Sequence, residues 1–217
     1  MLKNIKGAIF DMDGTLIDSM WVWSKIDEEY LKKRNIDLPK NLKEEIEHMS
    51  FLEVAQYFKN RFNLPDTINE IQNEWNNMAV NYYKNDVELK PGAKEFLSLL
   101  KSKQIKIGLA TSNYSVLVEL ALKKNGIYDF FDSITTTDEV TRGKDFPDVY
   151  LLAAERLNLK PEECVVFEDI LPAVKGAKSA NMLVIGVHDL YSEYQKQDII
   201  NLADMYISHY MELTEAV

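Results

Sequence analysis

Short apolar runs alternate with helical patterns from residue 91 onward, and this alternation constrains the fold more than any other feature. The runs lack polar alternation and are rich in β-branched residues, which is typical of strands buried on both faces of a parallel sheet. Apolar positions at helical spacing separate them. The pattern predicts an α/β protein with a doubly wound parallel sheet. Its strands are expected at 7–10, 105–110, 133–136, 165–167 and 183–187, with a weaker candidate at 205–207.

Residues 18–85 interrupt this rhythm, because they contain helical patterns and no strand pattern. One helix start is marked by Thr67 three residues before Glu70, the spacing of a capping box. We therefore expect two domains, an α/β core domain of residues 1–17 and 86–217 and an all-helical domain of residues 18–85. An insertion after the carboxyl end of a strand lies over the edge where such sheets bind ligands. The helical domain is accordingly interpreted as a cap.

Composition limits the partners and the compartment. The 217 residues include 25 Lys and Arg against 35 Asp and Glu, a formal net charge of −10, which disfavours nucleic acid and anionic membrane surfaces as partners. The single cysteine, Cys164, excludes an intramolecular disulfide framework and fits a reducing cytosol. The first apolar run, 8–10, is too short for a signal peptide or a membrane span. We expect a cytoplasmic protein that is a monomer or a weak oligomer.

The strongest chemical signal is the run Asp11-Met12-Asp13-Gly14-Thr15, directly after the first predicted strand. Two carboxylates two residues apart, followed by glycine, can approach one point while the chain turns. Turn chemistry alone is the alternative interpretation. A calcium loop is disfavoured, because Thr15 and Leu16 occupy the positions of an acid and a glycine.

A second acidic pair, Glu168-Asp169, ends the strand predicted at 165–167. The carboxyl ends of neighbouring parallel strands converge, so these acids are expected beside Asp11 and Asp13. Such a cluster repels itself unless a cation joins it, and oxygen ligands favour magnesium, with substrate phosphate completing the shell. A helix N-cap role for Asp169 is the other interpretation, and it is compatible with metal binding.

Two further junctions between strand and helix carry candidates for anion binding. Thr111-Ser112-Asn113 offers hydroxyls and backbone N–H groups at a helix start. Lys144 precedes another helix, although a lone lysine is more often a solvated surface charge. Lys144 is not a P-loop lysine, because no glycine stands five residues earlier and Asp145 replaces Ser or Thr.

Together the four motifs resemble those of the haloacid dehalogenase superfamily, in its β-phosphoglucomutase-like and phosphoglycolate-phosphatase-like branch. The Asp11–Thr15 run is the most specific piece, and residues 18–85 resemble the helical cap of that family. Asn181 stands where glycine is usual in the fourth motif, and Asn tolerates the left-handed conformation that glycine provides there.

The resemblance implies a magnesium-dependent phosphatase for a small phosphorylated metabolite such as a sugar phosphate. It implies Asp11 as nucleophile, forming an aspartyl-phosphate, and Asp13 as acid and base. It implies a metal site made by Asp11, the Asp13 carbonyl, Asp169 and Glu168. Phosphoryl oxygens are then held by Thr111, Ser112 and Lys144.

Alternatives remain within and beyond this family. Asp13 argues against dehalogenase activity, because dehalogenases lack the second acid. A β-phosphoglucomutase-type mutase is the main rival, although Trp23 stands where mutases carry a cap histidine and Phe51 falls near their cap arginine. A catalytically silent binding protein is the third option. In the cap, His48 and Trp23 are candidate substrate contacts, and aromatic packing is the simpler role for Trp23. The natural substrate cannot be read from the sequence.

Overall fold

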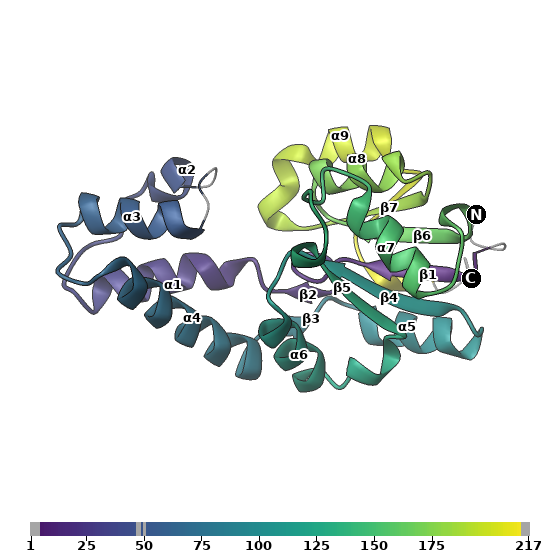
Figure 1. Ribbon diagram of the computed structural model, residues 1–217, viewed down its shortest axis with the longest axis horizontal. Coiled ribbons are helices and arrows are strands. Elements are labelled where there is room, and N and C mark those ends of the chain that lie inside the picture. The colour runs from purple at the N-terminus through teal and green to yellow at the C-terminus, as the bar shows by residue number, and fades with distance from the viewer. Residues whose placement is uncertain (1–4, 47–48, 50, 214–217) are drawn as a thin grey trace. The chain divides into compact units, whose positions relative to one another are not determined.

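A computed structural model describes residues 5–46, 49 and 51–213 (Figure 1). The chain divides into two compact units. Unit 1 comprises Met1–Ser19 and Val87–Val217, and unit 2 comprises Met20–Asp86.

Unit 1 is built on a six-stranded sheet with the order β5-β4-β1-β6-β7-β8. Every neighbouring pair in this sheet is parallel, so the carboxyl ends of all strands lie at one edge. The predicted doubly wound α/β fold is confirmed, and each predicted strand, including the weak one, is present within one residue of its expected bounds. The strands are β1 (Gly7–Phe10), β4 (Lys106–Thr111), β5 (Ser133–Thr136), β6 (Cys164–Glu168), β7 (Leu183–Val187) and β8 (Met205–Ile207).

Helices cover both faces of the sheet (Figure 1). The side chains of two successive residues of β1 pack against opposite helical layers. Ile9 belongs to a buried cluster with apolar residues of α7 (Asp148–Arg156), α8 (Leu171–Ser179) and α9 (Lys196–Leu202). Phe10 points to the opposite face, where its ring stacks on Phe167 with 4.4 Å between centroids. Phe96 of α5 (Ala93–Ser102) and Tyr210 of η5 (Tyr210–Leu213) complete that aromatic cluster. The two faces are thus buried separately, as period-two alternation requires.

The remaining elements of unit 1 connect the strands. They are α6 (Ser115–Lys124), η1 (Tyr128–Phe130), η2 (Thr137–Glu139), η3 (Pro161–Glu163) and η4 (Leu190–Gln195).

A second, two-stranded sheet joins the chain segments on either side of unit 2. Strands β2 (Ile17–Asp18) and β3 (Glu88–Leu89) pair antiparallel, with Ile17 opposite Leu89. This sheet was not predictable from the sequence, because two-residue strands are too short to show any periodicity.

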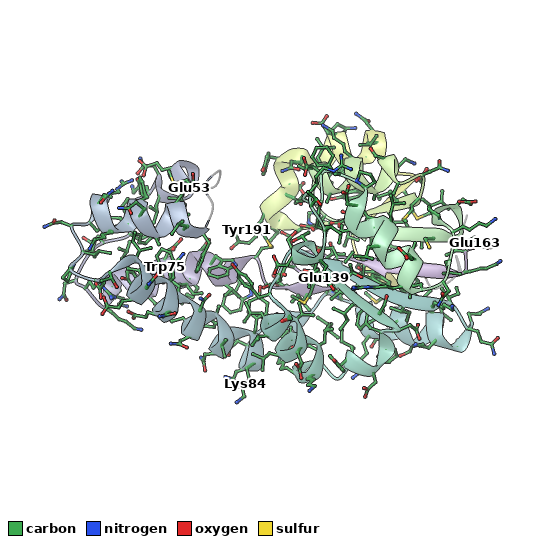
Figure 2. All side chains as sticks on the ribbon, in the orientation of Figure 1. Glu53, Trp75, Lys84, Glu139, Glu163 and Tyr191 are labelled. Carbon is green, nitrogen blue, oxygen red and sulfur yellow. The ribbon has the colours of Figure 1, made fainter. Side chains whose placement is uncertain are left out.

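Unit 2 is helical in its described residues. Its buried centre is aromatic and includes Trp75, which is labelled in Figure 2. The rings of Tyr30 and Phe58 each pack edge-on against the Trp75 ring, with 5.5 and 4.9 Å between centroids. The capping box predicted at Thr67 and Glu70 is present at the start of α4 (Ile68–Asn85). Among residues 5–46, 49 and 51–213, no helix is long and apolar enough to cross a membrane. The helices of unit 2 are α1 (Trp21–Lys32), α2 (Leu42–Ile46), α3 (Phe51–Arg61) and α4 (Ile68–Asn85).

Candidate active site

Three carboxylates meet at the carboxyl ends of two adjacent strands in unit 1. Asp11 follows β1, Glu168 is the last residue of β6 and Asp169 comes next, while the pairing of Phe10 with Phe167 sets the two strand ends side by side. The three residues are 7, 0 and 3 % exposed, and each offers an oxygen within 4.8 Å of the others. The structure thus brings together three of the four acids that were expected to meet at this edge.

Lys144 lies within this cluster. Its Nζ atom is 2.6 Å from Oδ1 of Asp11 and 2.5 Å from Oε1 of Glu168. The side chain is only 9 % exposed, so the expectation that a lone lysine is a solvated surface charge is wrong here. The strand order explains why Lys144 is buried. After β5 the chain crosses back past β4 and β1 to reach β6, and this crossing brings the Lys144 segment to the site at β1 and β6.

Gly176 of α8 allows the Lys144 segment to approach the helix closely. A Cβ atom at residue 176 would lie 2.0 Å from the backbone oxygen of Lys144 and 2.8 Å from that of Phe146. Both contacts are closer than real Cβ atoms make. Glycine in a helix interior costs about 1 kcal/mol relative to alanine, and here it removes a steric conflict with the segment that carries Lys144.

The ionisation of the cluster follows from burial and from the shortage of positive charge. Burial alone would lower the pKa of the Lys144 ammonium, but the charges of Asp11 and Glu168 outweigh it and raise that pKa above its usual value. Burial raises the pKa of Glu168 to about 8, and Lys144 only partly opposes this. Burial, followed by the charges of Asp11 and Glu168, raises the pKa of Asp169 well above its usual value. One ammonium thus faces three buried carboxyl groups.

Hydroxyl groups hold two of these acids in place. Thr15, which is fully buried, donates to Oδ1 of Asp169 at 2.9 Å, and Tyr150 of α7 donates to Oε1 of Glu168 at 2.7 Å. Asp169 does not cap α8, because the N-cap residue of that helix is Ile170. The N-cap interpretation of Asp169 is therefore wrong.

The donor set fits a hard divalent cation. It consists of carboxylate oxygens only, and Oε2 of Glu168 is buried with no hydrogen-bond partner. An orphaned buried carboxylate oxygen is costly unless a ligand satisfies it. A cation held by Asp11, Glu168 and Asp169 would supply the missing positive charge.

Asp13 lies two residues after Asp11 and accepts hydrogen bonds from two neutral donors. Oγ of Ser19 donates to its Oδ1 at 2.6 Å, and Nδ2 of Asn113 donates to its Oδ2 at 2.9 Å. Gly14 follows with φ of 79°, a conformation that glycine adopts without penalty. The Asp11–Thr15 run therefore forms a turn and also places two acids close together, so the two interpretations of this run are compatible.

Thr111 and Ser112 lie at the end of β4, the neighbour of β1 on its other side. Thr111 is buried, and its Oγ1 accepts a hydrogen bond from the backbone N–H of Asn113 at 3.1 Å. Ser112 is exposed at the same edge. These residues border the acid cluster from the β4 side.

The two candidates from the helical segment belong to unit 2. Trp23 packs its ring edge-on against Phe51, with 5.6 Å between centroids. His48 lies outside the described residues.

Four side chains contact the site acids without having been assigned a role from the sequence. Thr15 is the last residue of the first motif, Ser19 lies four residues beyond it, and Asn113 was noted only as part of a polar run. Tyr150 carried no signal, because a tyrosine on the buried face of a helix is indistinguishable from an ordinary core residue.

Known proteins resemble the chain along most of its length. The model of the haloacid dehalogenase-like hydrolase family matches residues 8–187. A phosphorylated carbohydrates phosphatase of Thermotoga maritima is 32% identical over 184 residues, which cover 82% of each chain. Hexitol phosphatase B of Escherichia coli is 28% identical, with 98% of this chain and 96% of that protein covered.

A solved structure of β-phosphoglucomutase from Clostridium difficile superposes with a TM-score of 0.72 at 25% identity, covering 97% of this chain and 93% of that one. The family model, the relatives named phosphatases and the fold all indicate the same family. The cluster of acids and Lys144 at the sheet edge is consistent with it. The chain belongs to the haloacid dehalogenase-like hydrolase family and is a phosphatase of that family.

Proposed function

We propose that the protein is a magnesium-dependent phosphomonoester hydrolase that acts on a small phosphorylated metabolite through a phosphorylated Asp11. One observation carries the proposal: Nζ of Lys144 lies 2.6 Å from Asp11 and 2.5 Å from Glu168 inside a buried group of three acids. A nucleophilic carboxylate beside a fixed cation is the arrangement that phosphoryl transfer requires.

In this proposal magnesium is held by four ligands: the carboxylates of Asp11, Glu168 and Asp169 and the backbone carbonyl of Asp13. When bound, the cation offsets the charge of the carboxylates and of the phosphoryl oxygens. The orphaned Oε2 of Glu168 supports its inclusion among the ligands.

The reaction is proposed to take place in two steps. In the first, a carboxylate oxygen of Asp11 forms a bond to phosphorus while the bond to the leaving oxygen breaks, and Asp13 donates a proton to that oxygen. In the second, Asp13 takes a proton from water, the water oxygen bonds to phosphorus, and the bond to Asp11 breaks. Lys144, Thr111 and Ser112 hold the transferring oxygens, where charge accumulates in the transition state.

The two hydrogen bonds that Asp13 accepts support its role in proton transfer. Ser19 and Asn113 both donate to its carboxylate, which fixes the orientation of that group beside the first strand.

A sugar-like substrate is proposed from the names of the relatives, a phosphorylated carbohydrates phosphatase and a hexitol phosphatase. Unit 2 is proposed to act as the cap, with Trp23 and His48 as candidate substrate contacts. The likeness to a β-phosphoglucomutase makes mutase activity the second candidate. The pair of rings formed by Trp23 and Phe51 favours hydrolysis, because these positions lack the histidine and arginine of the mutases.

The proposal is tested with an aryl phosphate and with β-glucose 1-phosphate. We expect aryl phosphate turnover that requires magnesium and disappears in Asp11→Asn, with Asp138→Asn as the control. With β-glucose 1-phosphate, the proposed activity releases inorganic phosphate. Turnover that survives in Asp11→Asn contradicts the nucleophile, and accumulation of glucose 6-phosphate without free phosphate favours the mutase.

A further inference from the structure

The two carboxylate oxygens of Glu168 have different surroundings. Oε1 receives the Tyr150 hydroxyl at 2.7 Å and the Lys144 ammonium at 2.5 Å, whereas Oε2 is buried with no partner. Both donors thus lie on one oxygen, and the carboxylate plane is fixed by them. The second oxygen remains available for a cation.

The hydroxyl of Tyr150 is placed to act on this carboxylate. The Tyr150 side chain is fully buried, and its hydroxyl donates to Oε1 of Glu168. Its position on α7, two residues after the helix begins at Asp148, is fixed by the packing of Val149 and Ala153 in the core.

We propose that Tyr150 is a positioning residue of the metal site, whose hydroxyl holds Oε1 of Glu168 so that Oε2 faces the cation. This inference rests on the proposed function, because it presupposes that the acid cluster binds magnesium. Hydrogen bonds from residues behind metal ligands orient those ligands, and losing one typically weakens metal affinity by about 10- to 100-fold.

Lys144 cannot replace this contact. Its ammonium is shared between Oδ1 of Asp11 and Oε1 of Glu168, and an ammonium is a point charge that does not fix the plane of a carboxylate. The phenol is held rigidly by its helix. Without it, the carboxylate of Glu168 is free to rotate toward Lys144 and away from the cation.

The test measures Mg²⁺ binding to the metal-free full-length protein by calorimetry, without any substrate. Tyr150→Phe removes only the hydroxyl and is expected to weaken the affinity for Mg²⁺ by about tenfold. Tyr30→Phe is the matched control, because Tyr30 is equally buried but belongs to unit 2, where its ring packs against Trp75. Thermal unfolding without metal verifies that both variants are folded.

A second comparison separates positioning from general loosening of the core. In a Glu168→Gln background the Tyr150→Phe substitution is expected to have no further effect on Mg²⁺ affinity, because the residue it orients has lost its charge. An equal loss in both backgrounds contradicts the proposal.

The remaining outcomes are also decisive. Wild-type affinity in Tyr150→Phe, or the same weakening in Tyr30→Phe, overturns the role of Tyr150 and leaves the proposed function standing. A wild-type protein that binds no Mg²⁺ overturns the metal site of the proposed function, and the role of Tyr150 with it.

Discussion

The ammonium of Lys144 lies 2.6 Å from Oδ1 of Asp11, although 133 residues separate the two in sequence. Asp11 directly follows the first strand of the sheet, and Lys144 belongs to the segment between η2 and α7. Their contact exists because β4 and β5 are added beside β1 and the chain then returns over the same edge. Because this buried ion pair lies inside unit 1, we expect that breaking it disturbs the site and also lowers the free energy of unfolding of unit 1.

Replacing Lys144 by Met should destabilise the protein and abolish turnover. The substitution leaves three buried acids without their cation, and breaking a buried ion pair costs about 3–5 kcal/mol. The loss in the free energy of unfolding should be larger at pH 8 than at pH 5. The reason is that acids with raised pKa values, such as Glu168 with a pKa of about 8, favour the folded state while protonated and oppose it once ionised.

Urea unfolding at both pH values checks this prediction, and adding Mg²⁺ at pH 8 should restore part of the loss. Lys175→Met, an exposed lysine of α8, is the control. Equal destabilisation at the two pH values would show that lost packing, rather than uncompensated charge, dominates.

Gly176→Ala should impair catalysis, although alanine favours helix by about 1 kcal/mol. The added Cβ would lie 2.0 Å from the carbonyl oxygen of Lys144, so the segment that carries the lysine has to move. We expect kcat to fall by about 10- to 100-fold, as small displacements of site groups do, while Ser179→Ala in the same helix leaves kcat unchanged. Wild-type kcat in Gly176→Ala would contradict the requirement for this close contact.

Asn113→Leu should slow the cleavage of alkyl phosphates more than that of aryl phosphates. Asn113 donates to Oδ2 of Asp13 at 2.9 Å, and without it the proposed proton donor is poorly placed. An aryl oxide leaves without a proton, whereas an alkoxide needs one. The ratio of kcat/KM for the two substrates should change by about tenfold, part of the 10²–10⁴ typical of general acid catalysis. Equal losses for both substrates would argue against an acid role of Asp13.

Asp27 of α1 should make the stability of unit 2 depend on pH. Burial raises its pKa from 3.8 to about 7. Between these values the folded state binds more protons than the unfolded state, so stability should fall as pH rises from about 4 to 7. The chain has 3 tryptophans, and all of them, Trp21, Trp23 and Trp75, belong to unit 2, so tryptophan fluorescence reports on its unfolding.

We expect the urea midpoint followed by fluorescence to decrease between pH 5 and pH 8 in the wild type. Asp27→Asn should reduce this decrease, and Glu28→Gln, its exposed neighbour, should not. An unchanged pH dependence in Asp27→Asn would mean that other groups control the stability of unit 2.

The sequence predicted the sheet of unit 1 well, because buried parallel strands are nearly continuous apolar runs. The runs at 7–10 and 183–187, for example, coincide with β1 and β7. The short pair β2 and β3 escaped prediction, because a two-residue pairing depends on chain segments that are far apart in sequence. Asn181, expected to tolerate a left-handed conformation, has φ of 60°.

The three clustered acids could be predicted because each lies at the end of a strand or directly after it, and the topology brings these strand ends together. The burial of Lys144 depends on the path of an irregular segment and on the absence of a side chain at Gly176. The contact of Tyr150 with Glu168 depends on the rotation of α7 about its axis. Neither the burial of Lys144 nor the contact of Tyr150 with Glu168 is indicated by a periodic pattern in the sequence.

The central claim, that Asp11 is phosphorylated, is tested most directly by trapping the intermediate. Asp13→Asn should accept a phosphoryl group from an aryl phosphate in the presence of Mg²⁺ and release it slowly, because the proposed base is missing. After acid quenching, peptide mass spectrometry should then find one phosphoryl group on Asp11, and none in the Asp11→Asn, Asp13→Asn double variant. Release of the aryl alcohol with no phosphoryl group on Asp11, or with the group on another residue, would contradict the account.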